Sequence, residues 1–80
     1  KRQIISHTIS LRTFESHIAE SLTAVQNKYK NVEIGSYPFF QAGKLGVSIV
    51  IRSDDESLIY KCSSDVMTFI NEKKIEVINR

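Results

Sequence analysis

The residue types that could do chemistry are few in this chain. His7 and His17 could ligate a metal, but Cys62 is the only thiol, and this set falls short of the four Cys or His ligands of a structural zinc site. The acidic run 54–56 could hold a divalent cation, yet adjacent residues in one helical turn point in different directions. A nucleophilic Cys62 would need a nearby base and an exposed cleft, which nothing in the sequence supplies. We therefore predict no catalytic residue, no metal site and no cofactor in this chain.

Glycine, proline and aromatic residues gather in one stretch, between residues 35 and 46. It contains every glycine and the only proline of the chain: Gly35, Pro38, Gly43 and Gly46. We predict that these four are backbone turn positions, with a bulge or a close backbone approach at Gly35.

The same stretch supplies a candidate interaction loop. Its members are the aromatic residues and the lysine of the stretch: Tyr37, Phe39, Phe40 and Lys44. Aromatic residues at the tip of a loop are typical of interface anchors. The alternative is that the aromatics cap the open end of the core.

Gly43-Lys-Leu-Gly46 also matches the G-x-x-G loop with which KH domains clamp an RNA backbone. In KH domains this loop joins two helices, whereas here it directly precedes a strand-like stretch. The formal net charge is only +2 and the basic residues form no long run, which argues against nucleic acid as a partner. A weak RNA-binding module that uses the Gly43 to Gly46 loop remains the alternative function.

Length and composition indicate one small globular domain. Eighty residues form a single core, and 41% hydrophobic with 25% charged residues is ordinary for a soluble chain. No apolar run approaches the roughly 20 residues that span a bilayer, so we expect no membrane partner. A lone cysteine allows no intrachain disulfide, which suits the cytoplasm. Since the chain begins with strand-like sequence and no Met, we expect residues 1–80 to be one domain of a longer protein.

Alternation of apolar and polar side chains predicts three strands, over residues 3–11, 32–38 and 46–53. Pro38 cannot donate to a ladder, so the second strand ends there or lies at a sheet edge, and we predict a loop over 39–43. Such a short connection favours an antiparallel hairpin. Residues 74–78 alternate weakly and form either a short fourth strand or a tail.

Helical spacing predicts two helices, over residues 14–29 and from about 54 to 71. The apolar stripe of the first is Phe14, Ile18, Leu22, Val25 and Tyr29, and that of the second is Leu58, Ile59, Cys62, Val66, Phe69 and Ile70. Thr13 is the expected N-cap of the first helix. Ser53 with Glu56 forms a capping box for the second.

The predicted order is β-α-β-β-α, with a short closing strand if residues 74–78 pair. Two helices with one apolar stripe each can cover one face of a mainly antiparallel sheet. The sequence therefore predicts a two-layer α+β domain, ferredoxin-like if the last strand forms.

The central stretch resembles a known family. Residues 32–40, Val-Glu-Ile-Gly-Ser-Tyr-Pro-Phe-Phe, and residues 43–52, Gly-Lys-Leu-Gly-Val-Ser-Ile-Val-Ile-Arg, are similar to the small domain of competence/damage-inducible protein A relatives. In that family the domain follows a molybdopterin-binding-like domain and is sometimes described as KH-like. A similar domain occurs in some eukaryotic FAD synthetases. The resemblance covers most of the chain, and its Gly-Ser-Tyr-Pro core is the most specific part.

The resemblance implies a function for a parent protein more than for this chain. In that family an N-terminal α/β domain carries nucleotide- or pterin-binding loops, and some members hydrolyse the pyrophosphate of ADP-ribose or FAD. None of those Gly-rich loops occurs in these 80 residues. We therefore expect a non-catalytic accessory or assembly domain, with the N-terminal domain of its parent and a second subunit as partners.

Overall fold

The structure is a computed structural model and describes residues 3–78 of the chain. Six elements follow one another: β1 (Ile5–Leu11), α1 (Glu15–Lys28), β2 (Glu33–Gln41), β3 (Lys44–Ser53), α2 (Glu56–Glu72) and β4 (Val77–Ile78). The predicted order of strands and helices is confirmed, and the closing strand forms.

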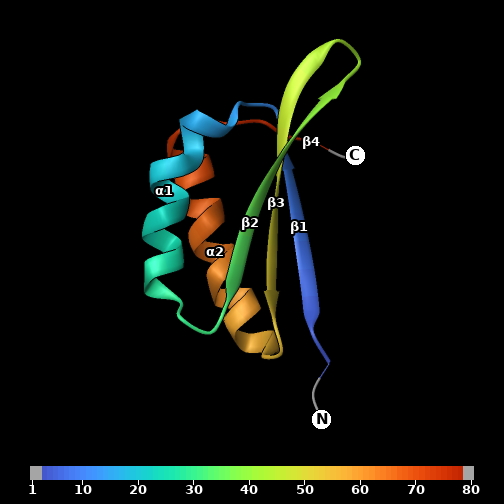
Figure 1. The fold of residues 1–80 in the computed structure, drawn as a ribbon. Coiled ribbons are helices and arrows are strands. Elements are labelled where there is room, and N and C mark those ends of the chain that lie inside the picture. The colour runs from blue at the N-terminus through green and yellow to red at the C-terminus, as the bar shows by residue number, and fades with distance from the viewer. Residues whose placement is uncertain (1–2, 79–80) are drawn as a thin grey trace.

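The four strands make one antiparallel sheet in the order β2-β3-β1-β4. Figure 1 shows both helices on one side of this sheet, with the other side left open. This is the two-layer α+β arrangement that the apolar stripes predicted, with the split β-α-β connectivity of ferredoxin-like folds. The molecule is elongated, 42 Å along its longest axis.

The core lies between the helices and the central strands. Its fully buried members come from β1, β3 and both helices: Leu11, Ile18, Val47, Ile49, Ile51, Cys62, Val66 and Ile70. Alternate residues of β3 point at the helices because side chains of a strand alternate between its two faces. Cys62 is a buried apolar side chain, as its position in the helical stripe predicts.

β2 is longer than the sequence predicts. It continues through Pro38 to Gln41, and Phe39 and Phe40 pair with Gly46 and Leu45 of β3, so the predicted loop over 39–43 is wrong. Pro38 is tolerated because β2 is an edge strand, where a missing N–H donor can face solvent. The pairing of β2 with β3 is continuous through Gly35, which excludes a bulge there.

The hairpin closes in a two-residue turn, Ala42–Gly43. Both residues have positive φ, 55° and 74°, which is the requirement of a type I′ turn. Gly43 adopts this conformation freely, whereas Ala42 is strained by its Cβ. The turn twists in the same sense as the strands and therefore keeps them paired up to Gln41 and Lys44.

Both helices start later than the sequence predicts. The N-cap of α1 is Phe14, which is exposed and makes no side-chain cap, in place of Thr13. The N-cap of α2 is Asp55, whose carboxylate accepts hydrogen bonds from the backbone N–H groups of Ser57 and Leu58. Ser53, the predicted cap, instead accepts a hydrogen bond from the Asp55 N–H and donates one to the Asn31 carbonyl, in the loop between α1 and β2. Neither helix is long and apolar enough to cross a bilayer within residues 3–78.

The strained turn residue yields a stability prediction. Ala42→Asn should stabilise the protein by about 0.5–1 kcal/mol, because Asn adopts positive φ at lower cost and Asn-Gly is the preferred type I′ pair. The check is the free energy of unfolding in urea. The matched control is Ala24→Asn on the exposed face of α1, where the same substitution should destabilise by roughly 0.5 kcal/mol because Asn is a poor helix former. A loss of stability in Ala42→Asn would contradict the turn assignment.

Candidate functional site

The β2–β3 hairpin projects past the helices as an arm, residues 38–47 (Figure 1). On its helix-side face Phe40 lies opposite Leu45, and these side chains are 70% and 58% exposed. Leu45 continues the buried row of Val47 and Ile49 along β3, and Phe40 lies beside it on β2, but the helices do not extend over this end of the hairpin. The arm thus presents a cross-strand apolar pair to solvent.

Two more aromatics occupy the opposite, open face of the same hairpin. Phe39 is partly buried and its ring lies over Gly46, where a Cβ would overlap the ring and approach the Leu11 backbone oxygen to 3.0 Å. Tyr37 leans over Gly35, where a Cβ would lie 2.8 Å from the tyrosine hydroxyl. Gly46 and Gly35 are therefore places of close approach by a side chain, and only Gly43 is a turn glycine.

The structure divides the predicted interaction loop into two faces. Phe40 is exposed on the helix side, and Tyr37 and Phe39 lie on the open side because side chains alternate along a strand. Leu45, which sequence analysis did not include in this loop, joins Phe40 at the surface. Leu45 lies two positions before Val47 and so on the same face of β3, which is the spacing of a core residue. Its exposure follows only from where the helices end.

Lys44 begins β3 at the base of the turn, opposite Gln41. Its backbone carbonyl and that of Leu45 accept hydrogen bonds of 3.4 and 3.3 Å from the Arg12 guanidinium. Arg12 thereby ties the arm to the end of β1, a contact across more than 30 residues that the sequence does not indicate. This exposed contact, called the Arg12 tether below, adds to the strand pairing that joins the arm to the sheet.

The open face of the sheet does not favour RNA binding. Gly43 and Gly46 lie in a hairpin, Gly46 inside β3, and not in a loop between helices as in a KH domain. The central strands carry Ser10 and Ser48 in the middle of this face, buried and joined by a 2.9 Å hydrogen bond. RNA-binding sheets of this type carry base-stacking aromatics on their central strands.

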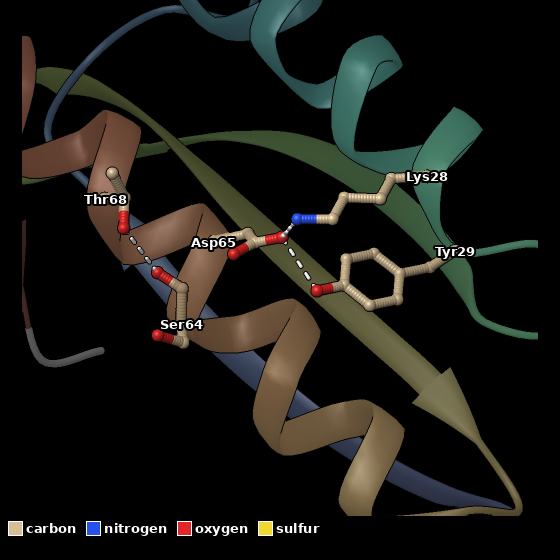
Figure 2. Close-up of polar contacts among 5 residues, drawn as sticks. All are labelled: Lys28, Tyr29, Ser64, Asp65 and Thr68. Atoms are coloured by element: carbon tan, nitrogen blue, oxygen red, sulfur yellow. Dashed lines mark hydrogen bonds and ion pairs between the residues drawn. The ribbon is translucent and has the colours of Figure 1, made fainter.

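Sequence analysis missed one polar cluster, shown in Figure 2. Asp65 of α2 accepts two hydrogen bonds on one carboxylate oxygen, from the Lys28 ammonium at 2.8 Å and from the Tyr29 hydroxyl at 2.7 Å. These residues are 36 and 37 positions apart in the chain. The cluster joins the C-terminal end of α1 to the middle of α2. No sequence signal distinguishes Asp65 from other exposed helical acids.

The cluster shifts the pKa values of its three side chains. The hydrogen bond from Lys28 lowers the pKa of Asp65, and the same contact raises the pKa of the Lys28 ammonium. The hydrogen bond to Asp65 raises the pKa of the Tyr29 hydroxyl. Nearby, burial raises the pKa of the Cys62 thiol to about 11, so the thiol stays protonated and unreactive at neutral pH. The cluster is therefore a structural clamp between the helices.

The candidate metal ligands remain apart. His7 lies on β1 and His17 on α1, where its ring packs against Phe14 with centroids 5.7 Å apart. Within residues 3–78, no three His, Cys, Asp or Glu side chains gather in a way that could hold a metal ion.

Comparison with known proteins identifies a family for the whole described domain. A family model described as the middle domain of FAD synthase matches residues 3–78. No curated protein and no solved structure matches the chain significantly. The match includes the hairpin arm, both helices and the closing strand.

The contact between Phe39 and Gly46 makes a quantitative prediction. Gly46→Ala should destabilise the protein by about 1–3 kcal/mol, because the new methyl group displaces the Phe39 ring. In a Phe39→Ala background the same substitution should cost much less, which a double-mutant cycle in urea measures. Gly35→Ala is the matched control and should cost less than Gly46→Ala, since only the half-exposed Tyr37 side chain must move. Equal costs of Gly46→Ala in both backgrounds would contradict the contact.

The Asp65 clamp makes a pH-dependent prediction. Asp65→Asn should lower the melting temperature at pH 7 by about 4 °C, because the charged acceptor for Lys28 and Tyr29 is lost. Because the pKa of Asp65 is lowered in the folded state, the ionised carboxylate stabilises the protein at pH values above the ordinary Asp pKa of about 3.9. This stabilisation disappears as the pH falls through the lower folded value, so the difference between the proteins should close in acid. Glu20→Gln, at an exposed site of α1, is the control and should change little at any pH.

Proposed function

The chain belongs to the FAD synthase middle-domain family, and on this premise we propose that it is a non-catalytic accessory domain that docks to a neighbouring domain of its parent enzyme through the hairpin arm. A domain described as a middle domain has neighbours in its parent, and one of these is the docking partner. The docking contact is the apolar pair Phe40 and Leu45.

The exposure of this pair is the observation that carries the proposal. Two large apolar side chains, opposite each other on paired strands, stand in solvent where the helices no longer cover the sheet. Aromatic and aliphatic anchors of this kind supply most of the energy of protein interfaces. An arm that served only the core would bury these residues.

The arm is also preorganised for binding. The type I′ turn, the Phe39 ring on Gly46 and the Arg12 tether all hold it in one conformation. A surface that is already ordered loses little conformational entropy when it binds. This rigidity supports a docking role over a flexible linker.

We assign the chemistry of the parent to its other domains. The resemblance in the central stretch suggests a molybdopterin-binding-like domain, of the kind that hydrolyses the pyrophosphate of ADP-ribose or FAD in some relatives. In the accessory domain the only thiol is buried and held protonated, and the Asp65 carboxylate is engaged with Lys28 and Tyr29. This chain would then position its neighbours and contribute no reacting group.

The test is a double variant in the full-length protein that contains this domain. Phe40→Ser with Leu45→Ser should release the domain from its neighbour, and limited proteolysis at the domain junction should become at least about tenfold faster because the docked state no longer protects it. Circular dichroism should show an intact fold, since both side chains are exposed.

Tyr60→Ser is the matched control. It removes an aromatic side chain that is 78% exposed, but from α2 and away from the arm. Proteolysis of this variant should proceed as in the unchanged protein. Unchanged proteolysis of the double variant, or turnover of ADP-ribose or FAD by residues 1–80 alone, would contradict the proposed function.

A further inference from the structure

The outer edge of β2 is described along its whole length. The strand order β2-β3-β1-β4 places β2 at the end of the sheet, so one side of it pairs with β3 and the other faces no strand within residues 3–78. A row of unpaired N–H and C=O groups is a template on which another chain can add a strand. β2 is nine residues long, and an unprotected edge of that length would invite association.

Two observations show which residues of β2 direct their backbone groups to this outer side. The N–H of Ile34 donates to a side chain of α1 and not to β3, so its backbone groups face outward. At the other end of the strand, Gln41 and Lys44 flank the two-residue turn as a hydrogen-bonded pair, so the neighbouring Phe40 also faces outward. Because backbone groups alternate in direction along a strand, the outward residues are the even-numbered ones: Ile34, Ser36, Pro38 and Phe40.

Gln26 of α1 engages the first part of this edge. Its side-chain amide accepts a hydrogen bond of 3.0 Å from the Ile34 N–H and donates one of 2.6 Å to the Val32 carbonyl. These are the two backbone groups that one residue of a neighbouring parallel strand would engage. The amide also donates to the Tyr29 carbonyl at 3.1 Å, which holds it at the end of α1. Gln26 therefore occupies the position that an added strand would need.

The next two outward residues are protected by other means. The Ser36 hydroxyl donates a hydrogen bond to the Glu15 carboxylate, in a groove between α1 and β2. A strand added beside Ser36 would cover this carboxylate, and burying a charge is costly. Pro38 has no N–H, so an added strand would find an acceptor there but no donor. Each outward residue from Ile34 to Pro38 thus has its own form of protection.

We propose that Gln26, Glu15 and Pro38 form an edge guard that keeps other strands off β2. The guard ends at Pro38, and the next outward residue is Phe40 of the hairpin arm. Docking through the arm therefore uses the exposed apolar side chains of Phe40 and Leu45, and not strand addition along β2. The guard does not depend on the docking role of the arm, since it acts in the chain alone.

Removing the guard should expose an edge that pairs with further copies of the chain. Gln26→Ala with Pro38→Thr frees the Val32 carbonyl and the Ile34 N–H and restores an N–H at position 38. This double variant should self-associate at least about tenfold more strongly than the unchanged chain, because unprotected edges pair with one another. Sedimentation velocity over a range of protein concentrations measures the difference.

Amide hydrogen exchange shows whether the association uses this edge. In the unchanged chain the N–H of Ser36 faces outward and should exchange quickly, whereas that of Tyr37 faces β3 and should be protected. In the associated double variant the Ser36 N–H should also become protected, because an added strand accepts from it. This protection should disappear again on dilution to the monomer.

Two further variants separate edge pairing from loss of stability. Ser36→Pro, added to the double variant, removes another outward N–H and should return self-association to the level of the unchanged chain. Val25→Ala leaves the guard intact but destabilises the core under α1, and it should not increase self-association. Circular dichroism shows whether each variant is folded.

Three results would overturn the proposal. The first is a folded double variant that associates no more strongly than the unchanged chain. The second is equal association in Val25→Ala, which would assign the effect to lost stability. The third is association without protection of the Ser36 N–H, which would assign it to another surface.

Pro38→Thr alone keeps the test decisive if the double variant fails to fold. It restores the missing N–H at an exposed position and leaves α1 unchanged, so it should associate more strongly than the unchanged chain. No gain in association would then contradict the guard. These measurements use the chain by itself, so they stand apart from the proteolysis that tests docking of the arm in the full-length protein.

Discussion

Burial of the helix-side face of β3 under α1 and α2 holds this domain together, and it stops where the helices end. At about 1.5 Å per residue the 14 residues of α1 span roughly 21 Å, and the 17 of α2 roughly 26 Å. At about 3.3 Å per residue the 10 residues of β3 span roughly 33 Å. The strand is longer than its cover, so one apolar row is buried at Val47, Ile49 and Ile51 and exposed at Leu45. The hairpin arm is a direct result of this difference in length.

The opposite end of the same antiparallel sheet is formed by the starts of β1 and β2 and by the end of β3. Within residues 3–78, β4 comprises Val77–Ile78 and pairs with Ser10 and Leu11, the last two residues of β1. The arm and the start of β1 therefore lie at opposite ends of the molecule (Figure 1). The Ser10–Ser48 pair and the contact of Lys28 with Asp65 serve the packing of the domain itself, which agrees with an accessory domain of the FAD synthase middle-domain family.

Local patterns predicted most of the fold. Alternation identified the strands at β1 and β3, and helical spacing identified α1 and α2, because each pattern reflects a single buried face. The order of the elements predicted an antiparallel sheet. Because Pro38 has no backbone N–H to donate, the sequence also predicted that β2 either ends at Pro38 or lies at the edge of the sheet. The Gly-Ser-Tyr-Pro core indicated relatives of competence/damage-inducible protein A first and FAD synthetases second, and the family model supports the second. These features depend on residues close together in the chain.

Only the tertiary structure decided which side chains are exposed and which meet, because both depend on residues far apart in the chain. Whether Phe40 and Leu45 are buried depends on where the helices stop, and the role of Gly46 depends on the ring of Phe39 across the hairpin. Asp65 meets Lys28 and Tyr29 only after both helices dock. The stretch from Gly35 to Gly46 was recognisable in the sequence by its glycines, proline and aromatic residues. Its division into a packed face and an exposed face was set by the fold, since solvent exposure depends on the neighbours that folding supplies.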